Sequence, residues 1–563
     1  MTLEVKKHEY LKFNKSLNEE YLLLQEKYSQ IYGKDKSIVL MQVGGFHEIY
    51  ATNERGYNLH KLSNLLNVVM SKKDKKRPEV SEKNPYMIGF PIVATPKYLK
   101  MLVELGFHVI KIDQVTDSPT PKRAITGIYS PGTFIEDMKS TDANYILSIF
   151  IEEIQQINNS YMLYIGLSII DLSVGKSIIH ETFAKKDDDK YSLDETLMFI
   201  HNFNPSEIII YHKNLVTYNE EQIKLYLELN DKKYLYYELD KNEYLRLDYQ
   251  NNLLKSIFTI ETYLSAVEDL DLEKINNGRT SYILLLDYCK RQNSSILSNL
   301  HRPEFYENNK YLHLGNNAID QLNILPVNNK SDSLFDIINF THTSMGKRFL
   351  KFNLSNPICE SNILNDRYEF IDDLRSNNID LSNFLKNIID IERLHRKISL
   401  KTLNPCEFYY LNDTYKEILN LYKGIGNLKI KKLFSKSVKD ELLEFISYYN
   451  KIFDFEEISK YILQDIGGSF FNKNINKEID ELQKKVSDKK DEINDIKCCL
   501  EKYIDNGKKD YFNNSSDEKS LINLSYNETE KFYFLITQKR AASLQSKFPK
   551  KQKTEKYKKL LSL

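Results

Sequence analysis

A ring and a carboxylate stand two residues apart directly after a pair of glycines. The ring is Phe46, the carboxylate is Glu48, and the glycines are Gly44 and Gly45. On an extended segment successive side chains point to opposite faces, so residues two apart share a face. The spacing predicts an aromatic surface beside a hydrogen-bonding carboxylate, with His47 between them turned inward.

The residues before this pair predict a strand and a tight turn. The apolar, β-branched run at 37–43 has the length of a buried strand. Gly44 and Gly45 lack a Cβ, so the backbone can turn sharply there or come close to another molecule. An ordinary half-buried strand gives the same alternation, with Phe46 in a core and Glu48 at an edge, so the pattern alone leaves both interpretations open.

Length and composition predict a multidomain globular protein. A chain of 563 residues, 41% hydrophobic and 28% charged, is too long for one core and typical of folded domains. No signal-like apolar core or run of about 18 apolar residues occurs, and the five cysteines lack ligand spacing. We therefore expect an intracellular, soluble protein with reduced thiols and no membrane partner, in a compartment that the sequence leaves open.

Nucleic-acid binding would require local positive charge, because the formal net charge is zero. Two basic stretches are candidates for contact with a DNA backbone, and each is equally explained as a solvated loop or tail. They comprise Lys72, Lys73, Lys75, Lys76 and Arg77 in the first stretch, and Lys539 and Arg540 at the start of the second.

Periodicity predicts two α/β units followed by helices. In the first unit, helices are expected at 18–33 and 57–70, strands at 86–90 and 108–112, and a helix capped by Thr95. The second unit combines strand-rich stretches at 145–154 and 161–182 with a helix near 194–203 and a strand at 207–211. From about residue 250 helical patterns dominate.

A heptad pattern marks one long helix at 475–503. Its a and d positions are apolar except for Lys489. Packing against another helix of the same chain and an intermolecular coiled coil both explain such a seam. Two short apolar stretches at 521–524 and 531–537 then predict paired strands.

Three blocks of sequence resemble the MutS family, in the family's order. The first comprises VLMQVGGFHEIYATN at 39–53, YMIGFPIVATPKYLKMLVELGFHVIKIDQV at 86–115 and GIYSPGT at 127–133. The others are SLFDIINFTHTSMGKRFLKFNLSNPI at 333–358 and IIDIERLHRKISLKTLNP at 388–405. The first block looks closest to the divergent branch of large DNA viruses and some organelles.

The resemblance implies an architecture of mixed α/β and helical domains. It assigns 1–138 to a mismatch-recognition domain, 142–245 to an RNase H-like connector, 250–505 to a long helical core or lever domain, and 506–563 to a partial β clamp. Phe46 and Glu48 match the family's Phe-x-Glu pair, whose ring wedges beside a mispaired base while the carboxylate hydrogen-bonds it. The partner implied is double-stranded DNA with mismatches or small loops, kinked at the wedge during mismatch repair.

One family feature is missing from these residues. MutS proteins are ATPases, but no phosphate loop of the form G-x-x-x-x-G-K-[ST] occurs, and Gly346-Lys347 lacks the earlier glycine. We therefore expect a chain truncated before the ATPase domain, whether by a split gene, by a truncated gene or as a fragment of a longer product. Such a chain would not itself be an enzyme and would have no cofactor, since ATP and Mg²⁺ belong to the missing domain. It could instead be a non-catalytic interaction subunit that partners a separately encoded MutS-type ATPase portion or a second copy.

Asp171 suggests a further activity that the resemblance argues against. It follows an apolar strand, much like the first carboxylate of an RNase H-like nuclease, and Glu152, Glu153 and Glu181 are near in sequence. Two-metal chemistry would require these carboxylates to converge on two ions. The MutS connector shares that fold and lacks the chemistry.

The missing phosphate loop generates the first prediction. The purified 563-residue chain should hydrolyse no ATP with or without mismatched DNA, as measured by phosphate release. ATP turnover that copurifies with the chain through every column would contradict it.

Overall fold

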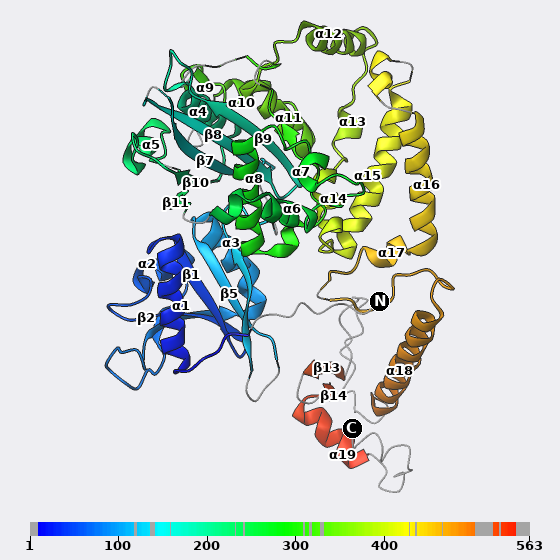
Figure 1. The fold of residues 1–563 in the computed structure, drawn as a ribbon. Coiled ribbons are helices and arrows are strands. Elements are labelled where there is room, and N and C mark those ends of the chain that lie inside the picture. The colour runs from blue at the N-terminus through cyan, green and yellow to red at the C-terminus, as the bar shows by residue number, and fades with distance from the viewer. Residues whose placement is uncertain are drawn as a thin grey trace. The chain divides into compact units, whose positions relative to one another are not determined.

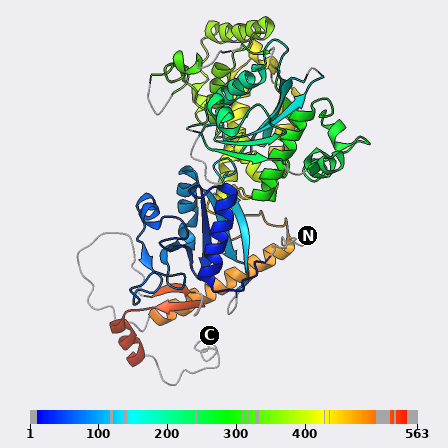
Figure 2. The same cartoon turned by 60° about the vertical axis from the view of Figure 1, so that its left-hand side comes forward.

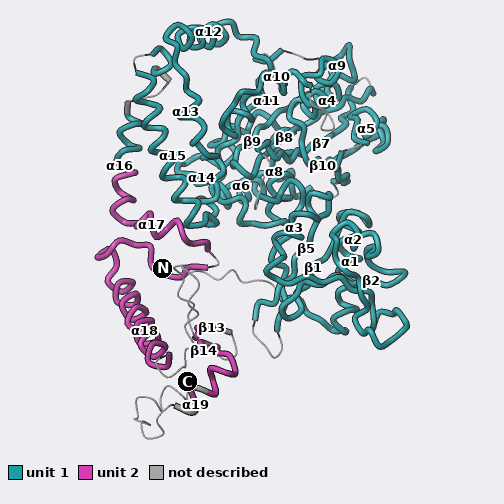
Figure 3. The backbone as a smooth tube through the Cα atoms, turned by 180° about the vertical axis from the view of Figure 1, so that it is seen from behind, with its two compact units in different colours: residues 1–443 teal, residues 444–563 magenta. Residues whose placement is uncertain are grey.

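The computed structural model describes residues 10–116, 121–135, 141–157, 159–230, 232–239, 242–307, 310–312, 314, 318–326, 332–426, 428–433, 436–463, 465–501, 522–527 and 531–547. It divides into two compact units, residues 1–443 and 444–563 (Figure 3). The residues after 547, which contain most of the basic C-terminal stretch, lie outside the described part. Among the described residues, no helix combines the length and apolar character that crossing a bilayer requires.

The first unit begins with a mixed six-stranded sheet in the order β3-β4-β2-β1-β5-β6. Strands β1 and β5 are parallel, and the other neighbours are antiparallel. The strands are β1 (Ser37–Val43), β2 (Phe46–Ala51), β3 (Ser71–Lys72), β4 (Tyr86–Pro91), β5 (His108–Gln114) and β6 (Arg123–Tyr129). The predicted strand before the glycine pair is thus confirmed, with a second strand directly after it.

Three helices accompany this sheet: α1 (Leu17–Tyr32), α2 (Leu59–Leu66) and α3 (Thr95–Glu104) (Figure 1). Tyr21 of α1 is fully buried against Tyr50 of β2, with ring centroids 5.1 Å apart in an edge-to-face arrangement. The predicted cap at Thr95 is wrong. A 3₁₀ turn at Ile92–Ala94 leads into α3, Ala94 holds the cap position, and the Thr95 hydroxyl is engaged by His47.

A second six-stranded sheet in the same unit has the order β11-β10-β7-β8-β9-β12. Strand β8 pairs antiparallel with β7 and β9, whereas the pairs β7·β10, β10·β11 and β9·β12 are parallel. The strands are β7 (Tyr145–Gln155), β8 (Tyr161–Asp171), β9 (Lys176–Phe183), β10 (Glu207–Lys213), β11 (Tyr234–Glu238) and β12 (Glu304–Phe305). Strand β12 comes from the region that sequence assigned to the helical domain.

Helices cover both faces of the second sheet, where α4 (Tyr191–Phe203) and α8 (Asn276–Gln292) lie on opposite sides (Figure 1). Side chains alternate along β7: Ile146 and Phe150 join a core shared with the first sheet, while Leu147 and Ile149 join a separate core. The first sheet and the second sheet therefore form two distinguishable bodies (Figure 2) linked through one apolar core.

The remaining described part of the first unit is helical, as predicted from about residue 250. Helix α5 (Glu220–Tyr226) precedes this region and lies between β10 and β11 in the chain. The other helices are α6 (Leu247–Lys255), α7 (Ala266–Asp269), α9 (Ala318–Gln321), α10 (Leu334–Ile338), α11 (Ser344–Ser355), α12 (Ser361–Ser376), α13 (Ser382–Leu385), α14 (Ile391–Ser399) and α15 (Pro405–Gly424). Helix α16 (Lys436–Ile452) contains the boundary between the units. The coarse prediction of α/β sheets plus many helices is confirmed, and the four-domain division stays a prediction.

The second unit contains the predicted long helix as α18 (Lys477–Glu501), together with α17 (Phe455–Ile458) and α19 (Gln538–Lys547). Strands β13 (Asn523–Asn527) and β14 (Lys531–Leu535) form the expected antiparallel pair. No residue of α18 is buried, and Leu482 and Val486 of the heptad seam are 53% and 45% exposed. Within the described residues the seam is thus at most partly covered, as at Ile493 and Ile496, and the two explanations of it stay predictions.

A buried polar cluster joins the two sheets of the first unit. Glu207, the first residue of β10, is 1% exposed, and its carboxylate lies 3.0 Å from Nε2 of His108, the first residue of β5. The hydroxyls of Ser130 and Tyr288 each donate to the same carboxylate over 2.5 Å. Burial raises the pKa of Glu207, but His108 and these hydroxyls lower it more, so it lies below its usual value.

This cluster predicts how acid weakens the first unit. The stability contributed by ionised Glu207 is present above its unfolded pKa and is lost as pH falls through its lower folded pKa. Glu207→Gln should lower the free energy of unfolding by about 1–3 kcal/mol at pH 7 and by less below pH ~4, measured by urea unfolding.

The matched control is Glu369→Gln. Glu369 pairs with Lys429 at the surface, where it is 61% exposed, and such pairs contribute about 0–1 kcal/mol. Equal urea midpoints for the Glu207→Gln variant and the unaltered chain at pH 7 would contradict a stabilising role for the cluster.

Candidate nucleic-acid interface

The hairpin of β1 and β2 presents the Phe-x-Glu pair. Val43 of β1 pairs with Phe46 of β2, and Gly44 and Gly45 form the exposed turn between them. Gly44 has a φ of +57°, a conformation that a residue with a Cβ rarely adopts. The glycine pair therefore permits the tight turn, and the turn places Phe46 at the first position of β2.

Phe46 and Glu48 share one face of β2, as the strand period predicts. Phe46 is 48% exposed, Glu48 is partly exposed, and His47 between them is 1% exposed. An exposed phenylalanine beside an accessible carboxylate is not a core arrangement. The structure thus argues against a core role for Phe46, and its contact with a base stays a prediction.

His47 anchors the pair from the opposite face of the strand. Its Nδ1 lies 2.8 Å from the Thr95 hydroxyl, and its Nε2 lies 2.9 Å from Oδ1 of Asp113 on β5. Burial raises the pKa of Asp113, but His47, Lys111 and the Thr126 hydroxyl lower it more, so it lies well below its usual range. The carboxylate remains ionised and fixes the imidazole ring beneath the hairpin.

Apolar residues beside Phe46 widen the exposed surface. Phe46 pairs with Pro91 at the end of β4, and the amide of Ile92 donates to the carbonyl of Gly45 over 3.0 Å. Val93, the next residue, is 94% exposed. Sequence reasoning missed these neighbours, although an apolar Pro-Ile-Val run between a strand and a helix was a usable signal.

The first basic stretch is split by the fold. Nζ of Lys72 donates to the carbonyl of Pro78 over 2.5 Å, and Nζ of Lys73 donates to Oδ1 of Asn18 over 2.6 Å. Lys75, Lys76 and Arg77 are exposed, Arg77 with Asp74 as an ion-pair partner at 3.3 Å. The exposed cations of this loop are thus Lys73 and the three residues of its second half, and Lys73 is already hydrogen-bonded to Asn18.

The second basic stretch belongs to the second unit. Lys539 and Arg540 are the second and third residues of α19, and Lys539 is exposed while Arg540 is partly buried. Their predicted contact with a DNA backbone stays a prediction.

The carboxylates of the second sheet do not converge. Asp171 is 2% exposed and accepts bonds from the backbone and hydroxyl of Ser173. It pairs with Tyr145 at the start of β7, whereas Glu153 lies eight residues further along that strand, roughly 26 Å away. Glu181 accepts from the backbone of residues 277 and 278. Among the described residues no group of three potential ligands could hold a metal ion, so the geometry gives nuclease chemistry no support.

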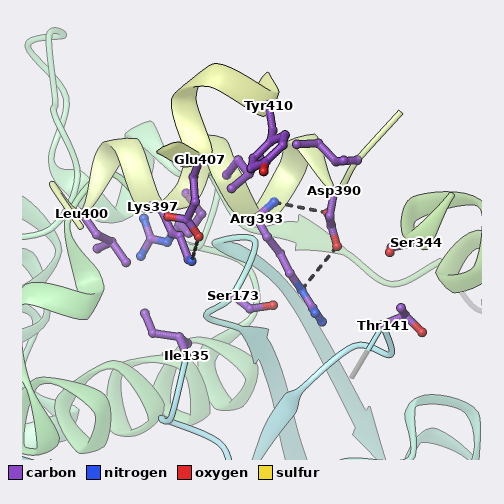
Figure 4. Close-up of a pocket in the computed structure, with 13 residues that line it drawn as sticks. Ile135, Thr141, Ser173, Ser344, Asp390, Arg393, Lys397, Leu400, Glu407 and Tyr410 are labelled. Atoms are coloured by element: carbon purple, nitrogen blue, oxygen red, sulfur yellow. Dashed lines mark hydrogen bonds and ion pairs between the residues drawn. The ribbon is translucent and has the colours of Figure 1, made fainter. Parts of the chain in front are cut away.

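A pocket of about 390 Å³ lies between the second sheet and the helices after residue 340 (Figure 4). Its cations have partners within the protein: Lys397 lies 2.5 Å from Glu407, and Arg393 lies 3.6 Å from Asp390. Arg396, 4% exposed, donates to backbone carbonyls that include that of Leu172, and burial lowers its pKa to about 10. Lys397 and Arg393 thus have ion-pair partners within the protein, and the guanidinium of Arg396 is occupied by backbone carbonyls.

Two family models match the chain. The model of MutS domain I covers residues 23–138, which contain the hairpin, and the model of MutS domain III covers residues 317–547. These two domains define a protein of MutS type.

Similar proteins carry the same family name. A mutS homologue of Acanthamoeba polyphaga mimivirus, named as a DNA mismatch repair protein, is 36% identical over 94% of this chain and 50% of its own length. The DNA mismatch repair protein MutS of Caldanaerobacter subterraneus subsp. tengcongensis is 26% identical over 95% of this chain and 56% of its own length. The chain belongs to the MutS family, and its likeness to a viral member is confirmed. It spans about half the length of these relatives.

A structure titled T. thermophilus RuvC in complex with Holliday junction substrate matches 26% of this chain and 94% of its own, at 10% identity and a TM-score of 0.16. A likeness this weak leaves the RNase H-like connector a prediction.

The geometry of the hairpin generates a stability prediction. Phe46→Ala should change the free energy of unfolding by no more than about 0.5 kcal/mol, because the ring is half exposed. His47→Ala should lower it by about 2–4 kcal/mol, because it leaves buried Asp113 and Thr95 without their partner. Urea unfolding of both variants measures the difference, and a greater loss in Phe46→Ala would show that Phe46 is a core residue.

Proposed function

We propose that this chain recognises mismatched or looped-out bases in duplex DNA, in the manner that its family resemblance implies. The observation that carries the proposal is the exposed ring of Phe46 at a hairpin end whose next residue, His47, is locked into the domain. The match to MutS domain I over residues 23–138 supports it.

In this proposal Phe46 acts as an apolar wedge in the minor groove. Inserting an apolar side chain unstacks a base step at a cost of a few kcal/mol, and unstacking a poorly stacked mismatch costs less free energy than unstacking a matched pair. This difference in unstacking energy lets the protein select deformable sites without reading base sequence. Glu48, on the same face, hydrogen-bonds the displaced base.

The exposed part of the basic loop suits contact with phosphates. Lys75, Lys76 and Arg77 follow the short edge strand β3, which joins the sheet beside β4. Such contacts hold a protein on DNA without sequence preference and weaken as salt rises. Lys539 and Arg540 are proposed to contribute in the same way from the second unit.

We further infer that these residues recognise DNA without hydrolysing ATP. No phosphate loop of the family's form occurs among the 563 residues. ATP and Mg²⁺ are assigned to an ATPase portion of the MutS type, which could act on this chain as a partner.

Mismatch preference is the direct test. The 563-residue chain should bind G·T and single-base-loop duplexes more tightly than a matched duplex of otherwise equal sequence, in fluorescence anisotropy titrations at one stated salt concentration. Phe46→Ala should reduce this ratio about tenfold, because the wedge is lost, while weak binding to the matched duplex persists. Glu48→Ala should also reduce it.

The outcome separates two classes of function. Equal binding to all three duplexes, insensitive to Phe46→Ala, would overturn recognition and leave the non-catalytic interaction subunit. The stability measurement on Phe46→Ala shows independently that the variant is folded.

A further inference from the structure

Glu48 is the end of a chain of hydrogen bonds that crosses the first domain. The hydroxyl of Tyr50, two residues along β2, donates to Oε2 of Glu48. Nζ of Lys73 lies 3.3 Å from the same hydroxyl and donates to Oδ1 of Asn18 over 2.6 Å. Three elements, the start of α1, the residue after β3 and the strand β2, thus converge on one carboxylate.

The geometry of Tyr50 leaves its hydroxyl little freedom. The ring is fully buried and packs edge-to-face on Tyr21, and the Lys73 ammonium lies 4.8 Å from the ring centroid. Because an ammonium only donates, its approach leaves the phenol hydrogen for the carboxylate. Burial raises the pKa of Tyr50, as does its bond to Glu48, so the phenol remains a donor.

The two oxygens of Glu48 are not equivalent in this arrangement. Oε2 is bonded to Tyr50, and no hydrogen bond to Oε1 is found within the described residues. A glutamate side chain has several rotatable bonds, so fixing one oxygen removes freedom that binding would otherwise have to remove. The remaining oxygen lies on the face of β2 that also presents Phe46.

We propose that Tyr50 is a positioning residue for mismatch reading, which holds one oxygen of Glu48 so that the other meets the displaced base, with Lys73 orienting the Tyr50 hydroxyl. The inference rests on the proposed function and deepens it, because it names what orders Glu48 before DNA arrives. It also gives Lys73, which is exposed, a role in ordering Glu48 beside the phosphate contact expected from sequence.

The test is the isosteric substitution Tyr50→Phe in the 563-residue chain. It removes the hydroxyl and keeps the ring that packs on Tyr21. We expect the ratio of G·T to matched-duplex affinity to fall about 3- to 10-fold, the net effect of one ordinary hydrogen bond, because Tyr50 acts on the base only through Glu48, with matched-duplex affinity unchanged.

Tyr21→Phe is the matched control. Tyr21 is equally buried, and its hydroxyl donates to the carbonyl of Val39 over 2.9 Å and not to Glu48. It should leave the ratio unchanged even where the urea midpoint falls. An equal fall of the ratio in both variants would assign the effect to packing and overturn the proposal.

A double-mutant cycle separates positioning from a general effect. In the Glu48→Ala background, Tyr50→Phe should cause no further loss of the ratio, because the carboxylate it positions is gone. Additive losses would overturn the proposal.

The cycle also distinguishes the two levels of inference. A ratio that falls with Phe46→Ala and Glu48→Ala but not with Tyr50→Phe refutes the positioning role and leaves the proposed function intact. A ratio insensitive to Phe46→Ala and Glu48→Ala refutes the proposed function, and the positioning role falls with it.

Discussion

The alternation of side chains along β2 is the constraint on which the recognition surface depends. Because successive residues face opposite ways, His47 can be held by Thr95 and Asp113 only if Phe46 and Glu48 are turned outward. A one-residue slip in the pairing of β1 with β2 would bury the ring and expose the imidazole. The positive φ of Gly44 fixes the turn, and the turn fixes that register.

The local part of this arrangement could be predicted from sequence, whereas its long-range partners could not. The strand at 37–43, the glycine turn and the inward direction of His47 all follow from residues within one hairpin. Thr95 and Asp113 lie 48 and 66 residues away, and no periodicity indicates that they meet at one imidazole. The sequence predicts a helix cap at Thr95 for the same reason, since a cap is the local explanation of a threonine before a proline.

The partners of charged side chains could be predicted from sequence less well than the secondary structure. A run of lysines indicates a solvated loop, but the direction of each side chain depends on what the fold brings near it. Asn18, 55 residues before Lys73, accepts a hydrogen bond from that ammonium, although Lys73 stays exposed. Helix α8 and strand β12 illustrate the same limit on a larger scale, since both pack on the second sheet from a region whose pattern indicated only a helical domain.

Strand β5 has a mechanical consequence for the first unit. At one end its Asp113 holds His47 beneath the hairpin, and at the other end its His108 meets Glu207 of the second sheet. The two residues are five positions apart, about 17 Å along a hydrogen-bonded strand that stretches little. Strand β5 therefore connects His47, which supports the Phe46 hairpin, to the contact between the two sheets. The support of the hairpin and the junction between the two sheets thus share one strand, and a shift of β5 would alter both.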